Sequence, residues 1–423
     1  MSKVMKLIPE LRFPEFQIER DWEYLNGNEL FETISNKNHN SDLPILAITQ
    51  EQGAVPRELI NYNVSVSDKS VESYKVVEVG DFIISLRSFQ GGIEYSKYLG
   101  LCSPAYIILR KKQNDSNNFY RHFFKSFLFI QDLNRNLEGI RDGKMISYKQ
   151  FSDILIPHPK KQEQQKIASC LSSLDELIAA HSDKLDALKD HKKGLMQNLF
   201  PQEGDASTGS ALPKVRFPEF ESDGEWEIKS IEENIDLISG IALKSKELSD
   251  DKSGTPILRG INITEGVIRH SDEMDKFFLG DKSELKKYLV EENDIVIGMD
   301  GSKVGKNVAL ISKEDSGSIL IQRVARIKAV NSDVNYLYQQ FVSYRFRRYV
   351  DVVNTSSGIP HISAKQIRDF EIGFPPKIEE QQKIASCLSA LDELITAQTE
   401  KIEELQQHKK GLMQGLFPRS ITN

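Results

Sequence analysis

The chain carries EQQKIASCLSSLDELIAAHSDKLDALKDHKKGLMQNLFP at residues 163–201 and, almost unchanged, EQQKIASCLSALDELITAQTEKIEELQQHKKGLMQGLFP at residues 380–418. A shorter motif, RFPEF, stands at residues 12–16 and returns at residues 216–220. Between these anchors the two halves differ strongly in sequence. Because an internal duplication predicts a repeated structural unit, the 423-residue chain is interpreted as two halves with the same plan.

Both repeated segments have apolar residues alternately four and three positions apart, which is the seam of a coiled coil. The expected seam is Ile167, Leu171, Leu174, Ile178, Leu185, Leu188 and Leu195 in the first copy, and Ile384, Leu388, Leu391, Ile395, Ile402, Leu405 and Leu412 in the second. His181/Gln398 and Lys192/Lys409 are polar seam positions that either set the register or are tolerated. A pseudo-two-fold relation between the halves would make the helices antiparallel.

The divergent middles contain short β-rich runs at residues 43–48, 81–86, 105–109, 255–258, 294–299 and 319–327. Each middle ends in an aromatic helical stretch, beginning at Asn118 and at Asn335. The expected fold class is α+β (mixed), with two α/β recognition domains and two long antiparallel helices. The expected divisions are residues 1–160 (first domain), 161–201 (first helix), 202–212 (linker), 213–378 (second domain), 379–418 (second helix) and 419–423 (tail).

The duplicated EQQKIA, LDELI, HKKGLMQ and LFP motifs, placed after two variable domains, resemble the specificity subunits of type I restriction-modification systems. This resemblance implies that each variable domain recognises one half of a bipartite, asymmetric target in double-stranded DNA. It also implies that the repeated helices form a spacer that docks two methyltransferase subunits, with restriction subunits joining the complex. S-adenosylmethionine, ATP and Mg²⁺ are then expected in the partner subunits, and no cofactor is expected on this chain.

Composition adds bounds on this interpretation. The net charge of −7 and pI near 5.8 mean that any DNA-binding surface must be local. The sequence has no apolar run of about 18 residues and no signal peptide at its start, so we expect a cytoplasmic protein without a membrane partner. Cys102, Cys170 and Cys387 have neither disulfide nor zinc spacing, so reduced thiols and no metal site are expected.

Motifs for catalysis are incomplete. The only Pro-Pro pair, Pro375-Pro376, lacks the flanking residues of a base-flipping methyltransferase loop. The Gly-rich stretch at residues 301–307 is one residue short of a phosphate-binding P-loop and ends in Asn307. Asp142-Gly143-Lys144 has nuclease-like spacing but reads as a turn. We therefore expect a non-catalytic subunit of a methyltransferase and deoxyribonuclease complex.

Polar loop residues are the candidates for DNA contact, because Arg, Lys, Asn and Gln read base edges and phosphates. Each of these residues could instead lie in a solvent-exposed turn without a role in binding. The candidates are Arg87, Ser88, Gln90, Arg141, Lys144, Tyr148, Lys149, Arg259, Asn262, Arg269, Lys303, Lys306, Ser357, His361 and Lys365.

Three other functions stay open on the sequence. The chain could be the specificity subunit of another restriction class with a fused methyltransferase-nuclease partner. It could also be a coiled-coil scaffold without DNA binding, or an enzyme whose site carries no recognisable motif.

Overall fold

Both repeated segments fold as single helices of 39 residues, α7 (Lys161–Leu199) and α11 (Ile378–Leu416). The computed structural model describes residues 9–40, 42–60, 71–112, 116–135, 146–201, 210–354 and 360–418. The chain divides into two units, one of Met1–Asp183 with Thr399–Asn423 and one of Lys184–Gln398. Each unit therefore combines one sheet-rich domain with part of each long helix, and each is described here by itself.

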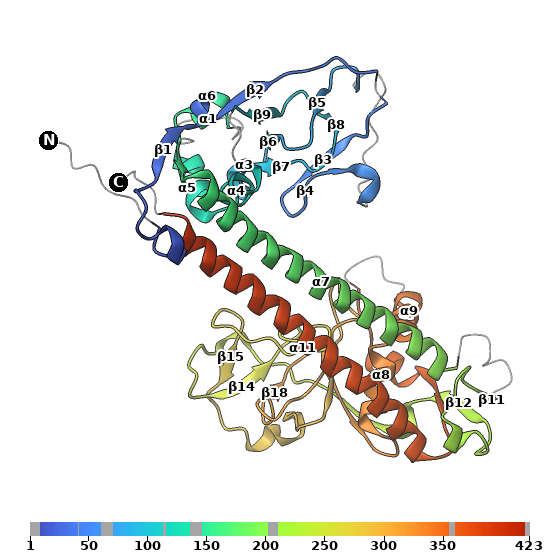
Figure 1. The fold of residues 1–423 in the computed structure, drawn as a ribbon. Coiled ribbons are helices and arrows are strands. Elements are labelled where there is room, and N and C mark those ends of the chain that lie inside the picture. The colour runs from blue at the N-terminus through green and yellow to red at the C-terminus, as the bar shows by residue number, and fades with distance from the viewer. Residues whose placement is uncertain are drawn as a thin grey trace. The chain divides into compact units, whose positions relative to one another are not determined.

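The two helices run antiparallel within each unit (Figure 1). In the first unit Ile167 and Leu171 of α7 share a hydrophobic core with Leu412 and Leu416 of α11. In the second unit the core contains Leu195 and Leu199 of α7 together with Ile384 and Leu388 of α11. The start of one helix thus packs against the end of the other in both units, which confirms the expected antiparallel arrangement.

The polar seam lysines are used for cross-helix ion pairs. In the second unit Lys192 Nζ donates to Asp392 Oδ1 and Oδ2 at 2.6 and 2.7 Å. In the first unit Lys409 Nζ donates to Asp175. Each pair links the HKKGLM motif of one helix to the LDELI motif of the other. A charged pair at a seam position favours one alignment of two helices, so these ion pairs are consistent with a register-setting role for the lysines.

The second repeated anchor, RFPEF, meets the first in space. Arg12 Nε and Nη2 donate to the two carboxylate oxygens of Glu163 at 2.7 and 2.8 Å. Arg216 makes the same bidentate contact with Glu380, at 2.7 Å for both bonds. All four side chains are buried. The sequence repeat therefore preserves a buried ion pair that ties the start of each half to a long helix.

Each unit is built on a four-stranded antiparallel sheet of the same order. The first sheet is β2 (Phe31–Ile34), β9 (Ile107–Lys111), β6 (Phe82–Ile84) and β7 (Glu94–Tyr95). The second is β13 (Ile235–Ser239), β19 (Val324–Ala329), β16 (Ile295–Gly298) and β17 (Val308–Leu310). The mixed α+β fold class is confirmed, and the two domains share their central topology.

Smaller sheets surround these centres. They comprise β1 (Glu23–Asn26) with β10 (Leu155–His158), β3 (Leu46–Thr49) with β4 (Gly53–Pro56), β5 (Lys75–Val77) with β8 (Gly100–Cys102), β11 (Ser210–Ala211) and β20 (Glu371–Phe374) on either side of β12 (Trp226–Ser230), and β15 (Lys276–Phe278) and β18 (Ile319–Leu320) on either side of β14 (Thr255–Leu258). Strands β1 and β10 close the first domain, as β12 and β20 close the second.

The remaining helical elements are short. They are η1 (Pro14–Phe16), α1 (Gly27–Leu30), η2 (Arg57–Leu59), α3 (Ser88–Gly91), α4 (Asn117–Phe123), α5 (Phe127–Arg135), α6 (Tyr148–Ser152), η4 (Pro218–Phe220), η5 (Glu232–Asn234), η6 (Ser245–Glu247), η7 (Ser283–Tyr288), α8 (Val334–Phe341), α9 (Tyr344–Val353) and α10 (Ala364–Arg368).

The structure breaks three segments that the sequence predicts as continuous. Both aromatic helical stretches are interrupted at a serine, because Ser126 Oγ and Ser343 Oγ accept hydrogen bonds from backbone N–H groups three residues later. The predicted strand at 319–327 is split into β18 and β19 by a turn at Gln322 and Arg323. Two residues of the predicted linker, Ser210–Ala211, form β11 and pair with β12.

No helix within the described ranges has both the length and the apolar character needed to cross a membrane. The three cysteines all lie among the described residues and form no disulfide with one another.

Candidate nucleic-acid interface

Two predicted contact loops of the second domain lie side by side. The turn that follows β16 pairs with the segment that precedes α10, since Gly301 N donates to Pro360 O at 3.0 Å and Ile362 N donates to Met299 O at 2.9 Å. This pairing brings the exposed side chains of Lys303, Lys306 and His361 to one region of the domain. Ser357 belongs to the same predicted loop but lies outside the described residues.

Asp300, which is not among the residues predicted from the sequence, holds this loop cluster together. Its carboxylate binds the His361 ring at Nδ1 through one oxygen and faces Arg323 Nε at 3.1 Å through the other. Arg323 lies at the turn between β18 and β19, and its side chain is 66% exposed. Its φ of 70° is unusual for a residue other than glycine. A strained, exposed arginine beside two predicted contact loops is a candidate base-reading residue.

The loop with Arg259, Asn262 and Arg269 differs from the expectation. Asn262 is fully buried, and its side chain accepts from Arg259 N and donates to Arg269 O, both at 3.1 Å. Arg259 is half-buried and donates to the carbonyl of Met274. Only Arg269 is exposed. Asn262 therefore shapes the loop from inside the protein, and Arg269 is the member of the set that the surface presents.

His270 fixes the same loop from outside. Its Nδ1 lies 3.2 Å from Asp275 Oδ1, and its Nε2 lies 2.8 Å from Asp315 Oδ1. Burial opposes protonation of this ring, but the hydrogen bonds and charges of Asp315 and Asp275 outweigh it and raise the pKa of His270. This contact ties the loop before β15 to the loop before β18.

The predicted contacts of the first domain likewise include both exposed and buried residues. Arg87 and Gln90 are exposed at α3, whereas Ser88 is buried and its Oγ accepts from Ser85 N at 2.9 Å. Tyr148 is half-buried and donates to Phe31 O at 2.9 Å. Arg141 and Lys144 lie outside the described residues. Burial thus turns Ser88 and Tyr148 toward the protein's own backbone.

Lys149 and Lys365 occupy the same place in the two domains. Each is the second residue of a short helix, α6 or α10, and each is exposed. The two helices begin with identical capping boxes, Ser147 with Gln150 and Ser363 with Gln366. The matching position keeps this pair among the candidate contacts.

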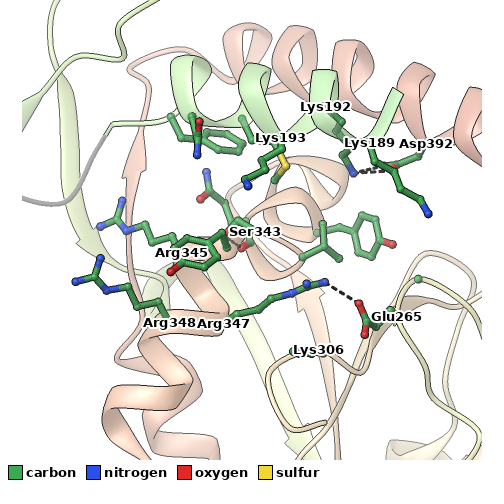
Figure 2. A pocket seen from close by; sticks show the side chains of 18 of the residues that line it. Lys189, Lys192, Lys193, Glu265, Lys306, Ser343, Arg345, Arg347, Arg348 and Asp392 are labelled. Atoms are coloured by element: carbon green, nitrogen blue, oxygen red, sulfur yellow. Dashed lines mark hydrogen bonds and ion pairs between the residues drawn. The ribbon is translucent and has the colours of Figure 1, made fainter. Parts of the chain in front are cut away.

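A basic groove of about 960 Å³ lies in the second unit between α7 and the α8–α9 helix pair. Figure 2 shows the groove with Lys189, Lys192 and Lys193 on α7 and with Arg345, Arg347 and Arg348 on α9, where Arg347 reaches Glu265. Lys306, one of the predicted contacts, also lines this groove. The first unit has a cavity of about 930 Å³ at the equivalent place, lined by α4, α5 and both long helices. Across the described ranges, no group of three or more His, Cys, Asp or Glu side chains is arranged to hold a metal ion.

Comparison with known proteins matches this architecture. The family model for the type I restriction modification DNA specificity domain matches residues 19–190 and 223–407, one match in each half. The MjaVIII type I restriction enzyme specificity subunit of Methanocaldococcus jannaschii is 24% identical over 444 residues, with 100% of this chain and 98% of that protein covered. The EcoAI specificity subunit of Escherichia coli is 32% identical over 201 residues, covering 46% of this chain and 33% of that protein.

Solved structures agree on the fold. The S subunit of a type I restriction-modification system from M. genitalium aligns with a TM-score of 0.57 at 15% identity, covering 97% of this chain and 99% of that chain. A structure described as showing complex assembly and conformational transition of the type I system aligns with a TM-score of 0.54 at 15% identity, covering 93% and 96%. Because the family model matches both halves, the chain belongs to the family of type I restriction-modification specificity subunits.

Proposed function

We propose that this chain is the non-catalytic DNA-reading subunit of a type I restriction-modification complex. Each recognition domain binds one half of a bipartite, asymmetric target. The main support for this proposal is the loop cluster of the second domain. There Asp300, Arg323 and His361 come together from three separate segments. Lys303 and Lys306 are exposed beside them. Exposed basic groups on loops that a sheet holds in place suit both phosphate contact and direct readout of bases.

The same central sheet with different loops supports separate half-site specificities. The strand order is the same in the two domains, yet the turn after β6 carries Arg87 and Gln90 while the turn after β16 carries Lys303 and Lys306. Loops can change without disturbing a sheet core, so one plan serves two base sequences. A coiled-coil scaffold without DNA binding gives no reason for such divergence between two copies.

The spacer helices support docking of two methyltransferase subunits, with restriction subunits joining the assembly. Leu177 of α7 and Leu394 of α11 occupy equivalent repeat positions and are 43% and 54% exposed. An exposed leucine at the same position in two nearly identical helices suits two copies of one apolar partner surface. In this proposal the partner subunits bind S-adenosylmethionine, ATP and Mg²⁺. The nearest alternative is that the chain is the specificity subunit of a system whose partner is a fused methyltransferase-nuclease.

Exchange of one domain tests the proposal. Residues 25–157 begin within β1 and end within β10, which pair antiparallel with Leu25 opposite Ile156, so both junctions fall in one pair of adjacent strands at the edge of the domain. With the first domain of another family member in this place, one half-site should change and the other should stay. Sequencing of methylated DNA from cells that carry the chimera and its partner subunits reports both half-sites. A change in both, or methylation without any defined target, contradicts the proposal.

A further inference from the structure

The groove of the second unit is strongly basic. Its described lining contains seven cationic residues, three from α7 (Lys189, Lys192 and Lys193), three from α9 (Arg345, Arg347 and Arg348) and Lys306. The lining contains two acidic residues, Glu265 and Asp392. The groove therefore carries five more positive than negative side chains, in a protein whose formal net charge is −7.

Both acidic residues are held by cations of the groove itself. Asp392 accepts hydrogen bonds from Lys192 at 2.6 and 2.7 Å, and Glu265 accepts from Arg347 Nη2 at 3.0 Å (Figure 2). Lys189 and Lys193 are exposed on the α7 side. Lys189, Lys193, Lys306, Arg345 and Arg348 also line the groove, from three elements, so positive side chains outnumber negative ones in its lining.

The start of α9 adds to this positive potential. Ser343, Tyr344 and Arg345 line the groove, and Ser343 is the N-cap of this ten-residue helix. The N-terminus of a helix carries a partial positive charge and exposes backbone N–H groups, which favours anions such as phosphate. Tyr344 is 68% exposed beside these groups. Side-chain charge and the helix dipole therefore act in the same direction.

The equivalent groove of the first unit is almost neutral. Gln406, Leu128 and Gln131 stand at the repeat positions of Lys189, Arg345 and Arg348. Its described lining contains five lysines and arginines against four acidic residues. Its histidine, His122, is kept neutral because burial lowers its pKa to about 4. The two grooves thus share their position and size but differ by about four charges.

This difference in charge between the two grooves argues that the second groove is not a docking site for a partner subunit present in two copies. Two identical methyltransferase subunits would select the same residues in both halves, and the proposed docking positions Leu177 and Leu394 are indeed identical. A ligand that meets only the second groove must be anionic and must lie near the second recognition domain. The DNA backbone meets both conditions, because Lys306 belongs both to the groove and to the predicted contact loop after β16.

We propose that the basic groove binds the phosphodiester backbone of DNA next to the second half-site. This inference rests on the proposed function and deepens it, since it adds a sequence-independent contact on one side of the target. Such contacts strengthen binding by releasing counterions, so they are read out in the salt dependence of affinity. They supply no discrimination between base sequences.

The triple variant Lys189→Gln, Arg345→Leu and Arg348→Gln gives the second unit the residues found at the matching repeat positions of the first. Fluorescence anisotropy of the full chain, alone and with its methyltransferase subunit, should be measured on target and random duplexes between about 50 and 200 mM salt. The slope of log Kd against log salt should fall by about 2 to 3, at roughly 0.9 for each lost contact. Affinity for both duplexes should fall by the same factor.

A charge-matched control is Lys282→Gln, Lys286→Gln and Lys313→Gln, three exposed lysines of the second unit that do not line the groove. Its slope should stay nearer to that of the wild type. Circular dichroism confirms that both variants are folded. The complementary variant Gln406→Lys, Leu128→Arg and Gln131→Arg should steepen the slope, because it builds the charged groove in the first unit.

The outcomes distinguish this inference from the proposed function. An unchanged slope in the groove variant overturns the groove assignment, as does loss of the methyltransferase subunit on size-exclusion chromatography with DNA binding intact. A wild-type chain and complex that bind target and random duplexes equally contradict target recognition, while the slope still decides the groove. A variant that loses discrimination between the duplexes, rather than affinity for both, also overturns the backbone assignment.

Discussion

In the first unit His122 packs against α7, with Nε2 at 3.0 Å from Ser172 Oγ and Nδ1 at 3.8 Å from Asp175. In the second unit Gln339 holds the equivalent position and donates to Asp392 at 2.8 Å. The aspartate and its cross-helix lysine are the same in both units, and only the domain residue that meets them differs. The spacer is thus kept constant while each domain adapts to it, as expected where two domains diverge on one framework.

The buried ion pairs are the strongest shared feature, and their loss should have the largest effect. Replacement of Arg216 by Met leaves the fully buried carboxylate of Glu380 unpaired, which should cost about 3–5 kcal/mol of unfolding free energy. Arg12→Met should cost a similar amount through Glu163. Urea denaturation followed by circular dichroism measures both. The double variant Arg216→Met with Glu380→Met should recover much of the lost unfolding free energy. If Arg12→Met and Arg216→Met lower the unfolding free energy by very different amounts, the two ion pairs are not equivalent.

The equivalent exposed leucines predict a smaller, stoichiometric effect. Leu177→Glu and Leu394→Glu should each weaken binding of one methyltransferase subunit by at least tenfold, because a charged group must then be buried at the interface. Mass photometry of the purified complex should show one subunit lost from each single variant and both lost from the double variant. Leu59→Glu, which changes a leucine that is 65% exposed outside the long helices, is the control. Full occupancy in the double variant would exclude this docking face.

His122 predicts a difference in acid sensitivity between the units. Burial lowers the pKa of His122 to about 4, against an ordinary value of 6.5. Between these values the unfolded chain binds a proton that the folded chain excludes, so stability should fall as pH drops from about 6.5 to 4. The contribution is on the order of 3 kcal/mol. His122→Gln should remove it, and Gln339→His should introduce it in the second unit. Thermal denaturation across this pH range checks both, and identical profiles for wild type and His122→Gln would contradict the assignment.

The sequence predicted the features that depend on local pattern. Spacing of apolar residues by three and four determines an amphipathic helix wherever it packs, so α7 and α11 end within two residues of the expected limits. The near-identity of the two copies required equivalent surroundings, which implied an antiparallel pair. Polar, Gly-rich turns after strands were also recognisable, and Lys303 and Lys306 are exposed as such turns require.

Features that depend on contacts between residues far apart in the sequence could not be predicted from local patterns. Asp300 and His361 are 61 residues apart, and Arg12 and Glu163 are 151 apart, so no local pattern links them. The run at 319–327 is apolar enough for one strand, but pairing of β18 with β14 and of β19 with β16 divides it at Arg323. Asn262 has the chemistry of a base-reading residue, yet only the folded loop determines that its amide is satisfied inside the protein. Residue type and spacing determined the helices and the repeat, whereas tertiary packing decided which polar groups stay at the surface, because a buried polar group must find its partners within the protein.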